Sequence, residues 1–149
     1  MRIRQNQAFT TQELSLLVKF FQTMGELPKL EHGGPADRAE RLQTWKLAMG
    51  TTLATTRPVV VEYWLKVLQF AEERYTVWLD MPLMQRSQVK CAPVLPKRYE
   101  DIEMWLHPRI FAALPVKLKE AVMQERSMGL NIPVAGMLFR LYTLMQLGG

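Results

Sequence analysis

The sequence predicts an all-α fold, and three observations lead to this prediction. Apolar residues keep helical spacing for more than four turns between residues 58 and 80. A capping-box pattern, Thr10 followed by Glu13, precedes another apolar stripe. No pair of segments alternates apolar and polar residues as paired strands do, and there is no internal repeat. We therefore expect one helical domain of about five to six helices over residues 1–149, with a helix and loop at 1–34 and the helical core at 35–149.

The first predicted helix covers residues 10–24. The Thr10 hydroxyl can accept a hydrogen bond from the backbone N–H of Glu13, whose carboxylate can accept one from the N–H of Thr10. Gly25 supplies a left-handed stop after the last apolar residue. Residues 26–35 contain two prolines and two glycines, which predict a loop.

The second predicted helix begins near residues 35–37, with Asp37 in the first turn, where a negative charge suits the helix dipole. Trp45 lies on its apolar face. Four threonines weaken its far end, and Pro58 closes it, because the residue before a proline avoids the helical region.

Residues 58–80 form the longest predicted helix, with Pro58 at its first position. The three valines at 59–61 resemble a strand, but the apolar stripe behind them keeps helical phase. This segment is therefore the predicted core helix. Residues 87–96, which contain Pro93 and Pro96, are expected to be irregular.

Three further helices are predicted in the last third of the chain. The first covers residues 99–114 and is expected to break or kink at His107-Pro108. The second covers 116–127, after Pro115 and before a stop at Gly129, and the last follows Pro133. Across the domain, the predicted core side chains are Trp45, Trp64, Leu68, Tyr75, Trp78, Leu114, Leu118, Leu138 and Leu141.

Composition argues against several classes of protein. A single cysteine excludes an intrachain disulfide framework, and two histidines leave little material for a metal site. Nowhere do 18 apolar residues run together, and no apolar stretch follows the basic N-terminus as in a secretory signal. We expect a protein of the cytoplasm or nucleus that is not secreted and has no membrane partner.

Catalytic groups that could converge are scarce. Cys91 and His107 are the only conceivable thiol–imidazole pair, and nothing near them in the sequence would lower the thiol pKa or orient the base. The adjacent acids Glu72 and Glu73 point in different directions on a helix. We expect no enzyme, no catalytic, metal-binding or cofactor-binding residue, no cofactor and no small-molecule substrate.

The net charge of +5 attracts polyanions, but the cations are scattered, and a solvated surface is the favoured explanation for them. The basic excess lies on either side of the acidic core helix. The candidate nucleic-acid-binding residues are Lys97, Arg98, Arg109, Lys117 and Lys119. Four of the ten methionines, adaptable residues at association surfaces, are candidates for exposure: Met24, Met84, Met104 and Met128.

Several short blocks occur in a characteristic order. They are Trp45 within a helix, RPVVVEYW at 57–64, AEERYTVWL at 71–79 followed by Pro82 and Arg86, ALPVKLK at 113–119, and LFRLY at 138–142 before QLGG at 146–149. Together they resemble the Gag-like region of Copia-type retrotransposon polyproteins. The resemblance covers roughly the last two thirds of the chain. Leu147 stands where the family carries a proline.

The resemblance implies a capsid-like helical bundle that is non-enzymatic and acts by self-association, with weak, non-sequence-specific RNA packaging. The chain has no Cys-Cys-His-Cys zinc knuckle and ends at Gly149, where a Gag protein continues, so the resemblance implies a truncated capsid-like piece. The alternative is a helical adaptor or nucleic-acid-binding module with the five candidate cations on one basic face.

Overall fold

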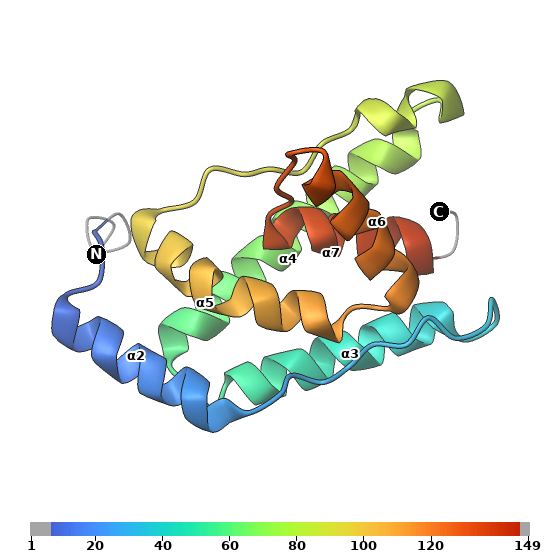
Figure 1. Cartoon of the computed structure of the whole chain (residues 1–149). Helices are drawn as coiled ribbons and strands as arrows, with labels where there is room; N and C mark the ends of the chain where they lie inside the picture. Colours follow the sequence, from blue (N-terminus) through green and yellow to red (C-terminus); the bar gives the residue numbers. More distant parts are fainter. Residues whose placement is uncertain (1–6, 147–149) are drawn as a thin grey trace.

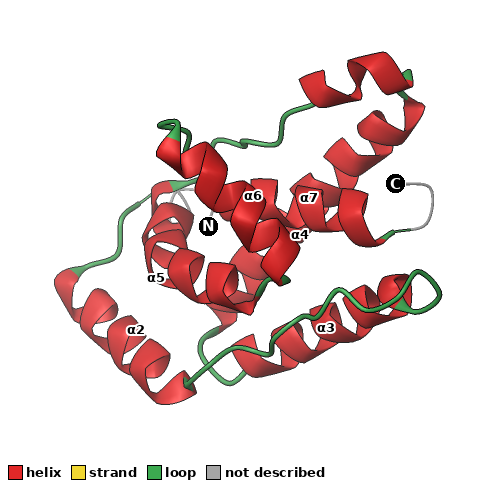
Figure 2. Ribbon diagram, turned by 45° about the vertical axis from the view of Figure 1, so that its right-hand side comes forward, coloured by secondary structure: helices red, strands yellow, loops and turns green. Residues whose placement is uncertain are grey.

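Six α-helices and one 3-10 helix make up residues 7–146, the part of the chain that this computed structural model describes, and this part contains no strand (Figures 1 and 2). The helices are α2 (Thr11–Met24), α3 (Arg38–Leu53), α4 (Pro58–Asp80), η1 (Leu83–Gln88), α5 (Lys97–Ala113), α6 (Val116–Ser127) and α7 (Val134–Met145). The all-α prediction is confirmed. The basic N-terminal residues 1–6 and the last three residues of the QLGG block lie outside the described range.

The centre of the fold is the pair formed by α4 and α7, which share the most extensive helix–helix contact. α4 presents a face that includes Tyr63, Val67 and Ala71, all fully buried. α7 is buried on nearly all sides, since it packs against α3, α4, α5 and α6, with α4 behind it in the view of Figure 1. A helix that is apolar all round can be stable in water only in such a position.

The N-terminal helix and the loop after it follow the sequence closely. Thr10 N–H donates to Glu13 Oε1 at 3.0 Å and Glu13 N–H donates to Thr10 Oγ1 at 3.2 Å, so the capping box is confirmed. Gly25 ends α2 with a φ of 78°. The loop then runs back along α3 (Figure 2).

α3 is shorter at both ends than the sequence predicts. Asp37 lies at the N-cap position and not in the first turn, and its Oδ1 accepts a hydrogen bond from Gly34 N–H at 3.0 Å. α3 ends at Leu53, well before Pro58. The hydroxyls of Thr55 and Thr56 donate to backbone carbonyls three residues back, a local alternative to helix continuation.

Of the predicted break or kink at Pro108, the break is wrong, because α5 continues as one helix from Lys97 to Ala113. Pro108 lacks the N–H that would bond to the carbonyl of Met104. Both residues are exposed, so water can satisfy this carbonyl. The helix therefore tolerates the proline on its solvent side.

Two predicted core residues, Leu68 and Trp78, are only partly buried, which corrects that part of the prediction. Leu68 lies at the edge of the buried face of α4. Trp78 lies where α4 projects beyond the bundle, and its ring is covered by Tyr75, with centroids 5.7 Å apart, and by the Arg86 guanidinium at 4.2 Å. The other predicted core residues are buried: Trp45, Trp64, Tyr75, Leu114, Leu118, Leu138 and Leu141.

The last turn of α4 and η1 form a projecting tip, residues 76–88, that stands away from the bundle (Figures 1 and 2). The sequence predicts no helix at 83–88. Leu83 and Met84 in η1 are 79% and 93% exposed. Among the described helices, none combines the length and apolar character that crossing a bilayer requires.

Candidate functional site

The loop between α2 and α3 places one cation beside α5 and α6. Trp45 Nε1–H donates to the carbonyl of Pro28 at 2.8 Å, and Leu30 N–H donates to the carbonyl of Ala113 at 2.8 Å. Leu30 is buried, whereas its neighbour Lys29 is exposed. The loop is therefore fixed to the bundle at two points, and Lys29 lies next to the turn between α5 and α6.

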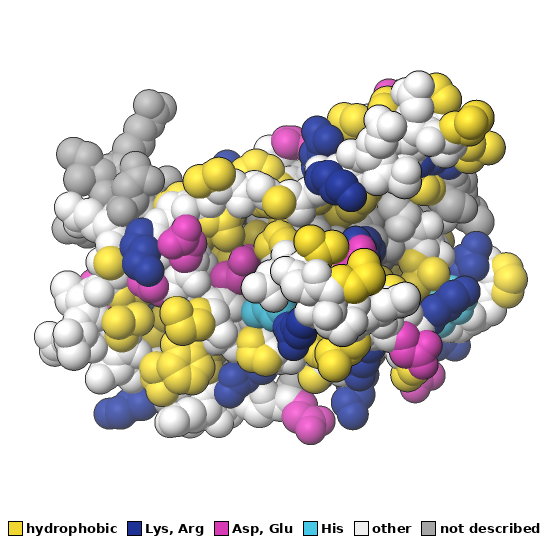
Figure 3. Space-filling view, turned by 45° about the horizontal axis from the view of Figure 1, so that its top comes forward, with side chains coloured by type: hydrophobic (Ala, Val, Ile, Leu, Met, Phe, Trp, Pro, Cys, Tyr) yellow, Lys and Arg dark blue, Asp and Glu magenta, His cyan; other side chains and the backbone are white. Residues whose placement is uncertain are grey.

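Four cations, Lys29, Arg109, Lys117 and Lys119, form what we term the cationic patch. They line two adjoining hollows of about 640 and 650 Å³, with Lys29 and Lys119 shared by both. None of the four makes an ion pair with a described residue. Lys and Arg side chains are visible along the lower part of the molecule in Figure 3.

Three carboxylates reduce the charge of the cationic patch. Glu26 lines one hollow, and Glu31 and Glu120 line the other. The N-terminal end of α6, at Val116, adds the partial positive charge of its helix dipole. The patch can attract phosphate groups, with a small net excess of positive charge.

The structure separates the other two predicted cations from this patch. Lys97 lies twelve residues before Arg109 on α5, which is about 18 Å along the helix axis. Lys97 Nζ lies 3.2 Å from Asp101 Oδ1. Arg98 lies 3.7 Å from the Glu13 carboxylate and over the Phe9 ring at 4.6 Å. Of the five predicted residues, the structure therefore brings together Arg109, Lys117 and Lys119, and it adds Lys29, which sequence reasoning missed.

A third hollow, the tip cleft, has a volume of about 570 Å³ and lies between the projecting tip, residues 89–92 and α7. Its apolar lining includes Trp78, Val89, Leu130, Ile132 and Phe139, and its cationic lining is Arg86, Lys90 and Arg140. Leu130, in the turn before α7, is 54% exposed at its rim.

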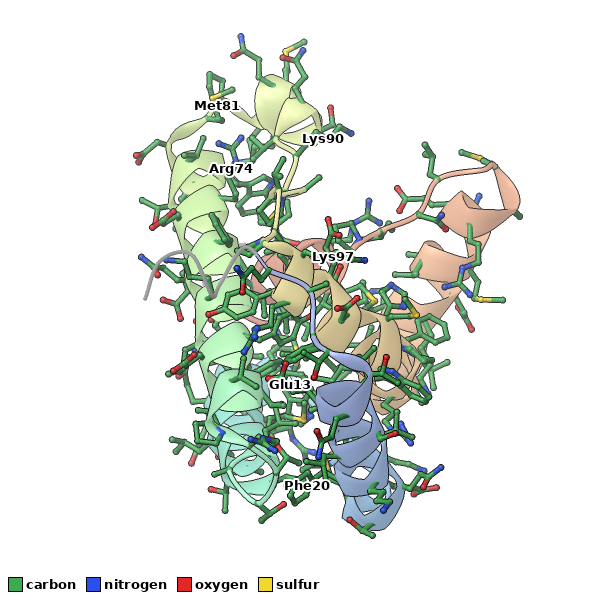
Figure 4. The ribbon with its side chains drawn as sticks, turned by 90° about the vertical axis from the view of Figure 1, so that its left-hand side faces the viewer. Glu13, Phe20, Arg74, Met81, Lys90 and Lys97 are labelled. Carbon is green, nitrogen blue, oxygen red and sulfur yellow. The ribbon has the colours of Figure 1, made fainter. Side chains whose placement is uncertain are left out.

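Backbone carbonyls fix two arginines, Arg86 in the lining of the tip cleft and Arg74 beside it. Arg74 Nε–H donates to the carbonyl of Lys90 at 2.8 Å, and Figure 4 shows these two labelled residues beside the tip. Arg86 donates to the carbonyls of Leu79 and Met81 at 3.2 and 3.3 Å. Such bonds fix the guanidinium groups without neutralising them.

The tip cleft is more positive than the cationic patch. Arg140 is paired with Glu125, the one carboxylate in the lining. Arg74, Arg86 and Lys90 have no described carboxylate within 4 Å. No sequence pattern predicts this site, because its cations come from separate segments that meet only in the folded chain.

Cys91 is buried, and His107 is hydrogen-bonded to the backbone. Burial raises the pKa of the Cys91 thiol to about 11, so the thiol is protonated at neutral pH. The Nε2 of His107 lies 2.8 Å from the carbonyl oxygen of Ile132 and must donate there, so this nitrogen cannot accept a thiol proton. Within the described residues, no three His, Cys, Asp or Glu side chains gather as a metal site requires.

A polar cluster that the sequence did not reveal joins α3, α4 and α7. The Tyr142 hydroxyl donates to Glu72 Oε1 at 2.8 Å and accepts from Lys46 Nζ at 3.0 Å. Burial and the neighbouring carboxylate of Glu72 raise the pKa of Tyr142. The phenol therefore stays protonated and serves as a cross-link between helices.

No protein-family model, curated protein or solved structure matches this chain. Its functional surfaces must therefore be inferred from its own residues. Three features stand out: the cationic patch, the tip cleft, and exposed methionines. Of the four methionine candidates, Met84, Met104 and Met128 are exposed, whereas Met24 is partly buried against the core.

Proposed function

We propose that this chain is a non-enzymatic structural protein of the cytoplasm or nucleus that associates with copies of itself, as Gag capsid domains of retrotransposons do. One observation carries the proposal: large apolar side chains on the projecting tip, Leu83 and Met84, stand almost wholly in solvent. Apolar groups gathered on a projecting element are typical of association surfaces. The all-α bundle and the resemblance of the ordered sequence blocks support the same proposal.

The proposed role includes weak RNA binding that does not read sequence. The cationic patch supports this part of the proposal, because Lys29, Lys117 and Lys119 are free to contact phosphates. The nearby carboxylates keep the net charge small, so the affinity should be low and should fall with salt.

A second candidate function is a monomeric nucleic-acid-binding module. The grouping of Arg109, Lys117 and Lys119 with Lys29 favours it. Such a module would bind RNA without self-association. The two functions therefore differ in one measurable property, the mass of the protein alone as its concentration rises.

Light scattering on a sizing column, over a range of protein and salt concentrations and with and without single-stranded RNA, tests the proposal. We expect the mass to rise with protein concentration and to rise further with RNA. The double variant Leu83→Ser/Met84→Ser should weaken association by about tenfold. The control is Leu47→Ser, which changes an equally exposed leucine on α3, outside the tip.

Two outcomes would contradict the capsid-like proposal. A strict monomer that ignores RNA would exclude both candidate functions. A strict monomer that binds RNA with a steep salt dependence would favour the nucleic-acid-binding module.

A further inference from the structure

We propose that the tip cleft of one copy binds the acidic outer face of α4 of a second copy. This inference rests on the proposed self-association and names the two surfaces that meet. It follows from three observations: the charge of α4, the lining of the tip cleft, and the directions in which the two surfaces point.

The outer face of α4 is an exposed acidic stripe. Its residues recur at helical spacing over 18 positions, about 27 Å, and are Glu62, Leu65, Lys66, Gln69, Glu73 and Asp80. Three carboxylates oppose one cation, and none of the three is ion-paired with a described residue. Leu65 lies within the stripe and is 59% exposed.

The tip cleft complements this stripe in both charge and polarity. Arg86 and Lys90 line the cleft and can meet carboxylates, and the apolar lining offers Trp78 and Phe139 to a leucine side chain. An apolar centre surrounded by charged groups is the usual anatomy of a protein–protein interface. Within residues 7–146, neither the outer face nor the charged lining contributed by Arg86 and Lys90 is paired with an opposite charge.

The two surfaces point in different directions. The outer face lies opposite the face of α4 that packs on α7, which includes Tyr63, Val67 and Ala71. The tip cleft instead lies on the α7 side, between Trp78 and Phe139. In Figure 4, α4 runs along the left margin, with its outer side turned away from the other helices.

One copy therefore cannot fill its own cleft with its own outer face. Each copy would donate an outer face to one neighbour and receive one from another. This contact is heterologous, and repeated contacts of this kind generate rings or filaments. Because each copy would make two such contacts, one kind of weak contact would be enough to build a large assembly.

Charge-reversal variants of the full-length chain test this contact. Lys90→Glu alters the cleft, and Glu62→Lys/Glu73→Lys alters the outer face. All three side chains are exposed and outside ion pairs with described residues, so the fold should be retained and is checked by circular dichroism. The matched control is Lys119→Glu, which has the same charge change in the cationic patch.

The measurement is sedimentation or light scattering over protein concentration at low and physiological salt. Each variant alone should associate about fivefold more weakly than the wild type, and the control should not. An equimolar mixture of the two variants should regain association, because a reversed cleft then meets a reversed outer face. The effect should shrink with salt, since the Debye length is about 8 Å at physiological ionic strength.

Three results would overturn the inference. If the wild type associates and the variants associate equally well, the contact lies elsewhere and the proposed self-association survives. If the wild type is monomeric at all concentrations, both proposals fail. If Lys90→Glu leaves association intact but lowers RNA affinity more than Lys119→Glu does, the cleft is a nucleic-acid site.

Discussion

Glu103 is a partly buried carboxylate on α5 whose Oε1 accepts a hydrogen bond from the Tyr63 hydroxyl at 2.8 Å. Burial raises the pKa of Glu103 above its usual value of 4.5, while the Tyr63 hydrogen bond acts in the opposite direction. Burial also raises the pKa of Tyr63, so the phenol remains the donor. The folded chain therefore holds a proton on Glu103 more tightly than the unfolded chain does.

We expect Glu103→Gln to change how stability depends on pH. Because the folded pKa is the higher one, the contribution of Glu103 to stability is fully present below pH 4.5 and is lost as pH rises through the folded value. Glutamine keeps the acceptor and does not titrate. Urea unfolding between about pH 4 and pH 7 should show the wild type losing stability relative to this variant as pH rises.

The companion variant Tyr63→Phe removes the donor that favours the charged carboxylate, so it should strengthen the pH dependence. A difference between wild type and Glu103→Gln that is constant across this pH range would contradict the assignment. The hydrogen bond between Tyr63 and Glu103 could not be predicted from the sequence, because the two residues lie 40 positions apart.

At the scale of the element, α5 shows how a helix can contain a proline. Pro108 removes one intrahelical hydrogen bond and leaves the carbonyl of Met104 to water. The helix continues because its other face buries Ile102, Leu106 and Ile110. Tertiary packing thus offsets a local cost that sequence reasoning takes as decisive.

We expect Pro108→Ala to stabilise the protein by about 1–3 kcal/mol, because alanine restores the N–H donor and suits the helix interior. Urea denaturation checks this value. The control is Pro58→Ala at the first position of α4, where proline fits the helix start and the change should be small. A Pro108→Ala variant no more stable than the wild type would show that the bundle imposes a kink that proline already matches.

At the scale of the whole molecule, Gly136 marks a close approach between α7 and the segment that leads into α5. A Cβ at this position would lie 3.0 Å from the carbonyl oxygen of Cys91 and 2.9 Å from Ile132 Cγ2. Gly50 in α3 has no such neighbours within 4 Å. A side chain at position 136 would therefore be crowded, whereas one at position 50 would meet open space.

We expect Gly136→Ala to destabilise the protein by about 1–3 kcal/mol through overpacking. Gly50→Ala should stabilise it by about 0.5–1 kcal/mol, since alanine is the better helix former. Thermal or urea unfolding of the two variants under one condition makes the comparison. Equal effects at the two sites would mean that the approach of residues 89–92 to α7 is not tight in solution.

The sequence by itself determined the all-α class, the capping box at Thr10 and Glu13, and the bounds of α4 and α6. These features depend on residues within about four positions of one another, since helix hydrogen bonds and caps are local. The same locality explains the errors. Local rules allow a helix to break at Pro108 and place Trp78 in the core, whereas the surrounding bundle decides both.

Only the tertiary structure decided which surfaces exist. In the folded chain, Lys29 lies beside Lys117 and Lys119. Lys97 and Arg98 instead form ion pairs at the other end of α5. The tip cleft is formed by segments that are separate in the sequence. Cations on different helices have no fixed spacing in sequence. Their positions follow from how apolar faces pack, and packing joins residues as distant as Glu72 and Tyr142, 70 positions apart.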